Sequence, residues 1–257
     1  MQLYWMRAIG VWLACICGIG FACQAVAQAA VVRSGTLQQT VFDDFQAGES
    51  NTRYTLESGQ GETVVRPTAL EAEPGDRVTV TGTMRDGRLV GAVESAEGGV
   101  GTSAVSPGQR KVAVILFTFP GYSAEPWSAG ETRSKVFTAP DSVDAFYREE
   151  SYGQISLTGK LDPDGDVFGW FQIATPAGGC AYEAWTEEAR QVAISEGVDL
   201  TGYQHVMYFF PQQSCLWNGI ADVGAGWSAI NGNRTVRTIA HEIGHNLGLL
   251  HANSTAS

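Results

Sequence analysis

The C-terminal half of the chain is organised around the stretch His241-Glu242-Ile243-Gly244-His245-Asn246-Leu247-Gly248-Leu249-Leu250-His251, which holds three of the four histidines. Residues four apart share one face of a helix, so His241 and His245 can present two imidazole nitrogens to one metal ion. Gly248 lacks a Cβ and can adopt the left-handed conformation that ends a helix, which would bring His251 to the same point. Three imidazoles leave one tetrahedral position open, as in a catalytic zinc site.

The alternative interpretation is an ordinary amphipathic helix whose histidines face solvent. It leaves Glu242 and His251 unexplained, and the full spacing is far more restrictive than H-E-x-x-H alone. We therefore predict a zinc site with His241, His245 and His251 as ligands. Zinc lowers the pKa of a bound water towards about 7, and Glu242 is predicted to act as the general base when this water attacks a peptide carbonyl.

The first 29 residues have the pattern of a signal peptide. Arg7 precedes an apolar run over residues 8–22, and Ala25-Val26-Ala27 fits a cleavage site near Ala27 or Ala29. The apolar run is shorter than the roughly 20 residues that span a bilayer. A lipoprotein attached through Cys23 is a weaker alternative. We expect a secreted or extracytoplasmic protein with no stable membrane anchor after signal cleavage.

Cysteine content and charge narrow the protein class. Removal of the signal peptide leaves only Cys180 and Cys215, which we predict to form one disulfide in an exported protein; two unpaired thiols are the alternative. A net charge of −11 does not provide the basic surface that nucleic acid requires, so we expect no nucleic-acid partner.

Residues 30–98 are predicted to form a small β-barrel-like domain or pro-segment. Strands at 53–57 and 62–66 flank Ser58-Gly59-Gln60-Gly61, and Asp86-Gly87 is a type I′ turn signal between a strand at 77–84 and a strand that begins at Leu89. No histidine or cysteine lies here, so the unit could cover the cleft, bind a partner or be a structural appendage. A Gly/Ser-rich linker follows over 99–110. It ends at Arg110-Lys111, which is either a processing site or the start of a strand.

Residues 111–257 alternate between strand and helix patterns, which indicates an α/β fold with a mixed, mostly parallel sheet. The predicted strands are 112–117, 155–161, 167–173 and 205–210, and the predicted helices are 143–150, 182–196 and one that begins near Thr235. Ser142 is the expected N-cap of the first helix. His205 is predicted to be a core histidine rather than a ligand.

Two further segments are candidate binding sites. An edge strand over 224–230 would let Gly226, Trp227 and Ser228 bind an extended substrate through the main chain, although a connecting loop is equally consistent. The run Asp162-Pro163-Asp164-Gly165-Asp166 has three carboxylates that could bind Ca²⁺, but an Asp-Gly turn explains it more simply.

The zinc motif resembles that of the metzincin metallopeptidases, and residues 110–253 are similar to the gametolysin family. The residues that carry the second resemblance are Phe146-Tyr147-Arg148-Glu149-Glu150-Ser151-Tyr152-Gly153, Cys180-Ala181-Tyr182 with Cys215, and Trp227-Ser228. The resemblance implies a metzincin-like upper subdomain with His241, His245 and His251 as zinc ligands and Glu242 as the general base.

Two features depart from the metzincin pattern. The methionine expected downstream of the third histidine is absent, since the methionines stand at positions 1, 6, 84 and 207, so we expect that the C-terminal part of the catalytic domain is missing. No cysteine precedes Cys180 once the signal is removed, which excludes latency through a pro-segment thiol.

The predicted function is that of a secreted zinc metalloendopeptidase. Its partner would be a protein or peptide substrate, such as an extracellular matrix or cell-wall protein, and its cofactor Zn²⁺. The alternative is a non-catalytic secreted binding module attached to a truncated, inactive peptidase remnant. Zinc content compared between the chain, His241→Ala and Glu242→Ala would separate a real metal site from a vestigial one.

Overall fold

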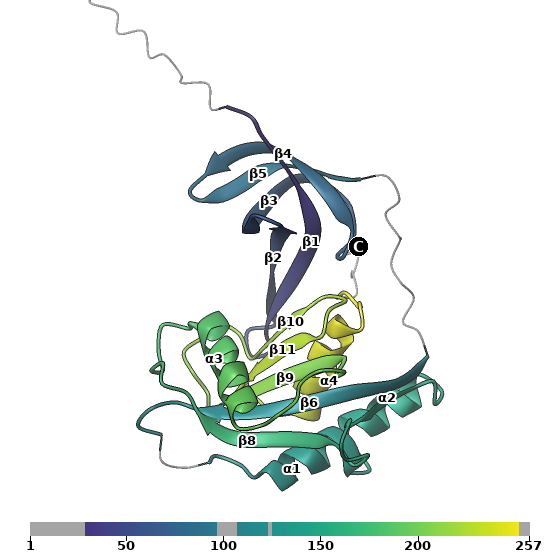
Figure 1. Ribbon diagram of the computed structural model, residues 1–257. Helices are drawn as coiled ribbons and strands as arrows, with labels where there is room; N and C mark the ends of the chain where they lie inside the picture. Colours follow the sequence, from purple (N-terminus) through teal and green to yellow (C-terminus); the bar gives the residue numbers. More distant parts are fainter. Residues whose placement is uncertain (1–28, 97–106, 123–124, 252–257) are drawn as a thin grey trace, which may run out of the picture.

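The computed structural model describes residues 29–96, 107–122 and 125–251 (Figure 1). The predicted signal peptide and most of the predicted linker lie outside the described residues.

The strands of the described part form one mixed sheet, in the order β2-β3-β5-β4-β1-β10-β11-β9-β6-β7, with β8 also paired to β6. Their bounds are β1 Val31–Asp44, β2 Glu49–Ser58, β3 Gly61–Glu71, β4 Arg77–Arg85, β5 Arg88–Ser95, β6 Gly108–Thr118, β7 Ile155–Thr158, β8 Asp166–Gln172, β9 His205–Phe210, β10 Gly219–Asp222 and β11 Trp227–Asn231.

The first five strands close on themselves, because β1 pairs with both β2 and β4. Both predicted hairpins are present: β2 pairs with β3, and β4 pairs with β5. Asp86 and Gly87 have φ values of 48° and 75°, the left-handed conformations that a type I′ turn requires. The interior is filled by side chains that alternate along these strands, namely Leu37, Leu56, Val65, Val78, Val80, Leu89 and Val93.

The other strands are mostly parallel, in agreement with the sequence pattern. β6 lies between β9 and β8 and is parallel to both, β11 is parallel to β9, and β10 is antiparallel to β11. The helical segments are α1 Ala129–Arg133, the π-helical turn η1 Ser134–Thr138, α2 Val143–Glu150, α3 Tyr182–Ser195 and α4 Val236–Asn246.

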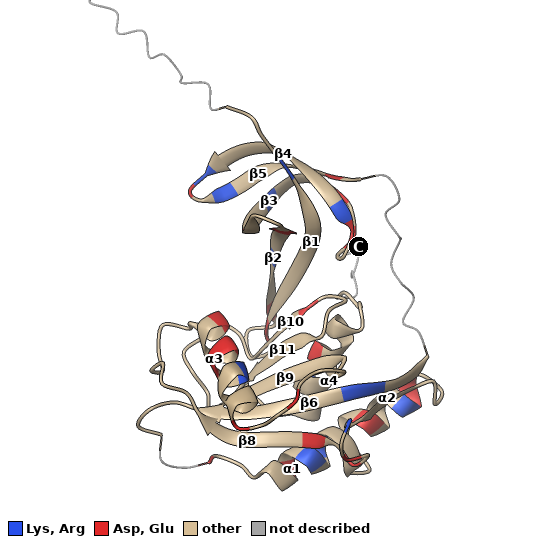
Figure 2. Ribbon diagram, viewed as in Figure 1, with Lys and Arg blue, Asp and Glu red and all other residues tan. Residues whose placement is uncertain are grey.

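Successive residues of the central strand point to opposite layers of helices. Val114 and Leu116 of β6 belong to the core beneath η1, α2 and α4, whereas Ile115 and Phe117 pack towards α3. Helix α3 therefore covers one face of the sheet and the other helices cover the opposite face (Figure 1). Acidic and basic positions are mixed along α2 and α3 (Figure 2). Within the described residues, no helix is long and apolar enough to cross a membrane.

Of the two interpretations of the dibasic pair Arg110-Lys111, the structure agrees with the strand, because the pair lies within β6, opposite Leu157 and Thr158 of β7. Two other details differ from the sequence expectations. The strand expected over 155–161 ends at Thr158. The segment 224–230 was expected to hold an edge strand, but β11 lies inside the sheet because β9 and β10 occupy both of its sides.

The main feature that the sequence did not reveal is that β1 extends from the closed N-terminal strands to the α/β sheet. Its second half leaves the closed strands and pairs with β10 in antiparallel register, from Thr40 opposite Asp222 to Asp43 opposite Gly219 (Figure 1). β10 would otherwise be the edge of the α/β sheet, so β1 joins the two parts of the chain at that edge.

Candidate metal centre

Helix α4 is placed by contacts at its start and along its buried face. The hydroxyl of Thr235 accepts a hydrogen bond from the N–H of Thr238 at 3.1 Å and caps the N-terminus of the helix, which was predicted to begin near this residue. Ile239 and Ile243 are fully buried in the core beneath the sheet. The hydroxyl of Tyr147 on α2 donates a 2.6 Å hydrogen bond to the carbonyl of Ala240. Core packing of Ile239 and Ile243 and the hydrogen bond to Ala240 therefore fix the helix close to the first histidine of the zinc motif.

Gly248 ends the helix as the sequence predicts. Its φ is 93°, its N–H donates to the carbonyl of His245 at 2.8 Å, and the N–H of Leu249 donates to the carbonyl of Gly244 at 2.9 Å. These two bonds form a Schellman motif, which satisfies carbonyls at the end of a helix. The left-handed glycine turns the chain back, so that His251 returns to the face that carries His241 and His245.

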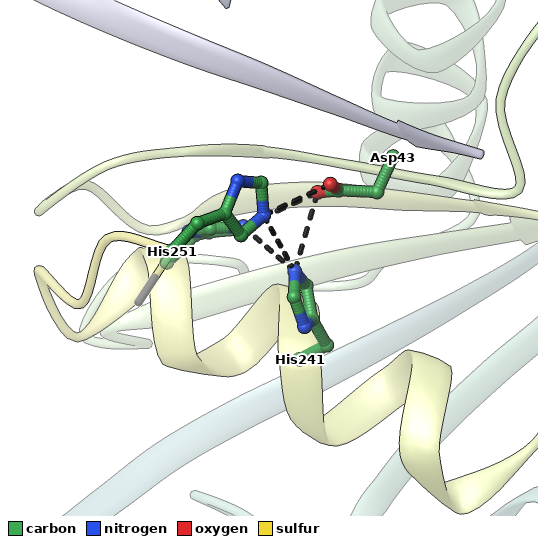
Figure 3. Close-up of side chains that lie close together, drawn as sticks. Asp43, His241 and His251 are labelled. Carbon is green, nitrogen blue, oxygen red and sulfur yellow. Dashed lines mark hydrogen bonds and ion pairs between the residues drawn. The ribbon is translucent and has the colours of Figure 1, made fainter. Parts of the chain in front are cut away.

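The three predicted ligands meet at one point. The Nε2 atom of His241 lies 3.0 Å from the Nε2 atoms of both His245 and His251. The close-up view shows His241 and His251 pointing at the same position above α4 (Figure 3). Two of the rings are oriented through their other nitrogen: Nδ1 of His245 lies 2.8 Å from the carbonyl of Leu249, and Nδ1 of His251 lies 3.1 Å from the hydroxyl of Ser50. A donor at Nδ1 leaves the Nε2 lone pair free for a metal.

A fourth group, which the sequence did not reveal, completes the cluster. The Oδ1 atom of Asp43 lies 2.9 Å from Nε2 of His251, and its Oδ2 atom lies 3.2 Å from Nε2 of His245 and 3.4 Å from Nε2 of His241 (Figure 3). Burial alone would raise the pKa of the Asp43 carboxyl, but its hydrogen bonds to His241 and His245, together with the charges of His241 and His251, hold this pKa well below its ordinary value.

The donor set fits a zinc ion. The ligand atoms of Asp43, His241, His245 and His251 all lie within 4.8 Å of one another, and they are the single group of this kind in the described part of the chain. Zn–N bonds of about 2.0–2.1 Å in a tetrahedral site place neighbouring ligand atoms about 3.3 Å apart, close to the separations found here. Imidazole and carboxylate are both ordinary zinc ligands. The residues present therefore fit a tetrahedral zinc site.

Glu242 lies beside the cluster and has no hydrogen-bond partner. It is 0% exposed, and neither of its carboxylate oxygens bonds to another described group. It packs against Gly219 of β10, where an added Cβ would lie 2.0 Å from Oε1. Burial, with a smaller contribution from the charge of Asp43, raises the pKa of Glu242 well above its ordinary value. A buried carboxylate without a partner has a high affinity for a proton, which suits a general base.

Gly226, Trp227 and Ser228 lie away from the edge where we expected them to bind substrate. Trp227 and Ser228 pair with β9, Ser228 also pairs with β10, and Ser228 is fully buried. Their visible role is to anchor the motif helix, because the side-chain amide of Asn246 donates to the carbonyl of Trp227 at 2.7 Å. Without β1, β10 would be the edge strand of this part of the sheet.

The other predicted sites have local explanations. Cys180 and Cys215 form the predicted disulfide. Asp166 accepts backbone N–H groups from Lys160, Leu161 and Asp162, so its carboxylate stabilises the turn rather than facing a vacant calcium position. His205 is buried as expected, but its Nδ1 atom has no hydrogen-bond partner among the described residues.

Two histidines and a buried glutamate on α4, joined by His251 from the segment that follows the helix, define a metallopeptidase-like centre. The chain belongs to the gametolysin peptidase M11 family, whose family model matches residues 111–256, more than half of its length. A search of curated proteins found no match.

Two solved structures are similar in part. One is a full-length MCM homolog from Methanopyrus kandleri, with 16% identity, a TM-score of 0.22, and coverage of 47% of this chain and 20% of that chain. The other is a chaperone-substrate complex, with 16% identity, a TM-score of 0.37, and coverage of 82% of this chain and 32% of that chain. We draw nothing about fold or function from either likeness.

Proposed function

We propose that the chain is an exported zinc-dependent endopeptidase. The observation that carries this proposal is the convergence of three imidazole Nε2 atoms beside a buried, unpartnered glutamate on helix α4. Family membership supports the peptidase class. The signal-like sequence and the disulfide support export, since disulfides persist in oxidising compartments.

His241, His245 and His251 would hold the metal, and the convergence of their Nε2 atoms supports these as the ligand atoms. When bound, zinc lowers the pKa of a water molecule and polarises a carbonyl oxygen. Glu242 is placed to accept the proton of the attacking water on its carboxylate and to pass it to the leaving amine. Its burial supports this role because it raises the proton affinity of the carboxylate.

The substrate class follows from the position of the edge strand. β10 lies next to the metal cluster and presents a strand edge to which an extended chain can pair, as β1 does in this structure. Main-chain pairing of this kind suits a protein or peptide in extended conformation. A matrix or cell-wall protein remains our proposal for the natural substrate.

Metal content tests the site directly. We expect one zinc per chain by mass spectrometry of the purified protein, loss of zinc in His241→Ala, and retention of zinc in Glu242→Ala. His205→Leu, which removes the fourth histidine, is the matched control and should retain zinc. Absence of zinc from the unmodified chain would refute the proposed function.

Hydrolysis is best measured in the Asp43→Ala chain, in which the carboxylate no longer lies at the open position. We expect cleavage of unfolded casein, and a decrease of about 10²-fold or more when Glu242→Ala is added, because general acid–base catalysis contributes about that much. Stoichiometric zinc without any hydrolysis in Asp43→Ala would instead favour the non-catalytic alternative.

A further inference from the structure

The position of Asp43 is the observation that leads beyond the proposed activity. Its carboxylate contacts all three imidazoles, at distances of 2.9, 3.2 and 3.4 Å. A catalytic zinc site keeps its fourth position for water or substrate, whereas a site with four protein ligands is closed. Asp43 therefore occupies the one position at which the chemistry would take place.

The strand that carries Asp43 also covers the edge next to the site. β1 pairs with all four residues of β10. The carbonyl of Gln39 accepts the N–H of Val223 at 2.8 Å, the carbonyl of Asp43 accepts the N–H of Asn218 at 2.8 Å, and the hydroxyl of Thr40 donates to Asp222 at 2.6 Å. An extended substrate that pairs with β10 needs the same backbone groups, so it must displace β1 from β10 in order to bind.

Glu242 is enclosed by the same contact. Asp43 lies opposite Gly219 in the pairing of β1 with β10, and Gly219 packs directly on the carboxylate of Glu242. Glu242 is 0% exposed, and its carboxylate has no hydrogen-bond partner within residues 29–96, 107–122 and 125–251. A buried carboxylate without a hydrogen bond destabilises a folded protein. Such a group is expected where the partner of the carboxylate in the active enzyme has been displaced.

The contact extends beyond one carboxylate. The ring of Phe45 lies 5.0 Å from that of His241 in an edge-to-face arrangement, and Ser50 lies 3.1 Å from Nδ1 of His251. On the opposite face of β1, the ring of Phe42 lies 5.7 Å from that of Tyr182. Arg53 forms an ion pair with Glu183 of α3. The segment from β1 into β2 therefore contacts the histidines, the edge strand and α3 together.

We propose that the N-terminal strands β1 to β5 hold the peptidase in a latent state, with Asp43 as the fourth ligand of the metal. This inference rests on the proposed function, since a latent state has meaning only for an active metal site. Release requires that β1 leave β10, which frees the fourth position, the strand edge and Glu242 at once. The inhibitory ligand would be a carboxylate rather than a thiol, since no cysteine precedes Cys180 once the predicted signal peptide is removed.

The competing interpretation is that Asp43 belongs to a permanently closed, structural zinc site. The latent and the structural interpretation differ in whether the protein retains the metal when the carboxylate is removed. A structural ligand is needed to retain the metal, whereas an inhibitory ligand can be removed and leaves a three-histidine site that binds metal and accepts an external ligand.

The test uses the full chain loaded with Co²⁺, whose visible spectrum reports the ligands, and acetohydroxamate as a small probe that binds an open metal position. The variants are Asp43→Ala and Asp43→Asn, the second of which keeps the size of the side chain. Glu49→Ala, which removes an exposed carboxylate from the adjacent strand, is the matched control. Zinc-loaded samples of the same variants are assayed on casein.

We expect both Asp43 variants to retain cobalt and to change spectrum at a hydroxamate concentration at least tenfold below that needed for the unmodified chain and for Glu49→Ala. We also expect at least tenfold faster casein cleavage in the Asp43 variants. An equal hydroxamate response in the unmodified chain would overturn latency and leave the proposed function standing. Loss of cobalt from both Asp43 variants would overturn it in favour of a structural ligand. Absence of cobalt from every chain would overturn both proposals.

Discussion

The hydroxyl of Tyr147 lies 2.6 Å from the carbonyl oxygen of Ala240 and donates a hydrogen bond to it. Both residues are buried, and the bond links α2 to α4 one residue before the first predicted ligand. Burial raises the pKa of the Tyr147 hydroxyl far above its ordinary value, so it remains a donor throughout the physiological pH range. Tyr147 thus positions the helix that carries His241 and His245.

Tyr147→Phe is expected to lower the free energy of unfolding by about 1 kcal/mol, the usual net value of one hydrogen bond. Urea denaturation of the zinc-loaded chain measures this. Tyr152→Phe, in which the changed residue is 93% exposed, is the control and should change stability by less than about 0.5 kcal/mol. Equal stabilities for the two variants would mean that the bond to Ala240 contributes nothing.

Gly219→Ala tests the packing of β10 against Glu242. A Cβ at this position would lie 2.0 Å from Oε1 of Glu242, so the buried carboxylate must shift. We expect a loss of about 1–3 kcal/mol, as for other overpacked interiors. Gly130→Ala is the control, because the nearest atom to its added Cβ is 3.9 Å away, and it should be neutral or slightly stabilising.

The double variant Gly219→Ala/Glu242→Ala identifies the cause of this loss. Removal of the carboxylate makes room for the methyl group, so the combined cost should be smaller than the sum of the single costs by more than about 0.5 kcal/mol. Additive costs would show that the methyl group clashes with something other than Glu242.

The part of the site that the sequence predicted is the part that local chemistry determines. The start of the helix near Thr235, the spacing of the histidines and Gly248 as the left-handed terminus all depend on residues within or next to one helix. The same is true of the hairpin turn at Asp86-Gly87. Patterns of period, cap and turn are visible in a single sequence because their partners lie a few residues away.

Asp43 could not be found in this way because its partner His245 is 202 residues distant. Val41-Phe42-Asp43-Asp44 has the pattern of an ordinary strand end, and only the pairing of β1 with β10 brings it to the metal cluster. β10 itself has four residues, Gly219-Ile220-Ala221-Asp222, which is too short for a periodic signal. The sequence analysis therefore predicted the edge strand at the residues of β11, whereas β10, the preceding strand, holds the position that β1 covers.

The disulfide is expected to contribute substantially to stability. Cys180 and Cys215 are 35 residues apart, and closing a loop of this length lowers the entropy of the unfolded chain by an amount worth about 4 kcal/mol. The double variant Cys180→Ala/Cys215→Ala should lose stability of that order in urea denaturation. Reductant should bring the unmodified chain towards the variant and leave the variant unchanged; equal stability with and without reductant would contradict this prediction.

His205 gives the chain a pH dependence separate from that of the metal site. Burial, with a smaller effect from the charge of Arg110, lowers the pKa of His205 from 6.5 to about 4. Between these values the unfolded chain binds a proton that the folded chain does not, so stability is fully present above pH 6.5 and falls as the pH falls to 4. From pH 7 to pH 5 this loss amounts to about 2 kcal/mol.

His205→Leu removes the titrating group and places an apolar side chain at this buried position of β9. The unmodified chain should therefore lose about 2 kcal/mol more than the variant between pH 7 and pH 5 when both are unfolded in urea with the same zinc loading. The variant leaves the residues of the histidine cluster unchanged, so the difference between the two slopes belongs to His205. Parallel slopes would show that His205 is protonated in the fold as readily as in the unfolded chain, which its burial at 5% exposure argues against.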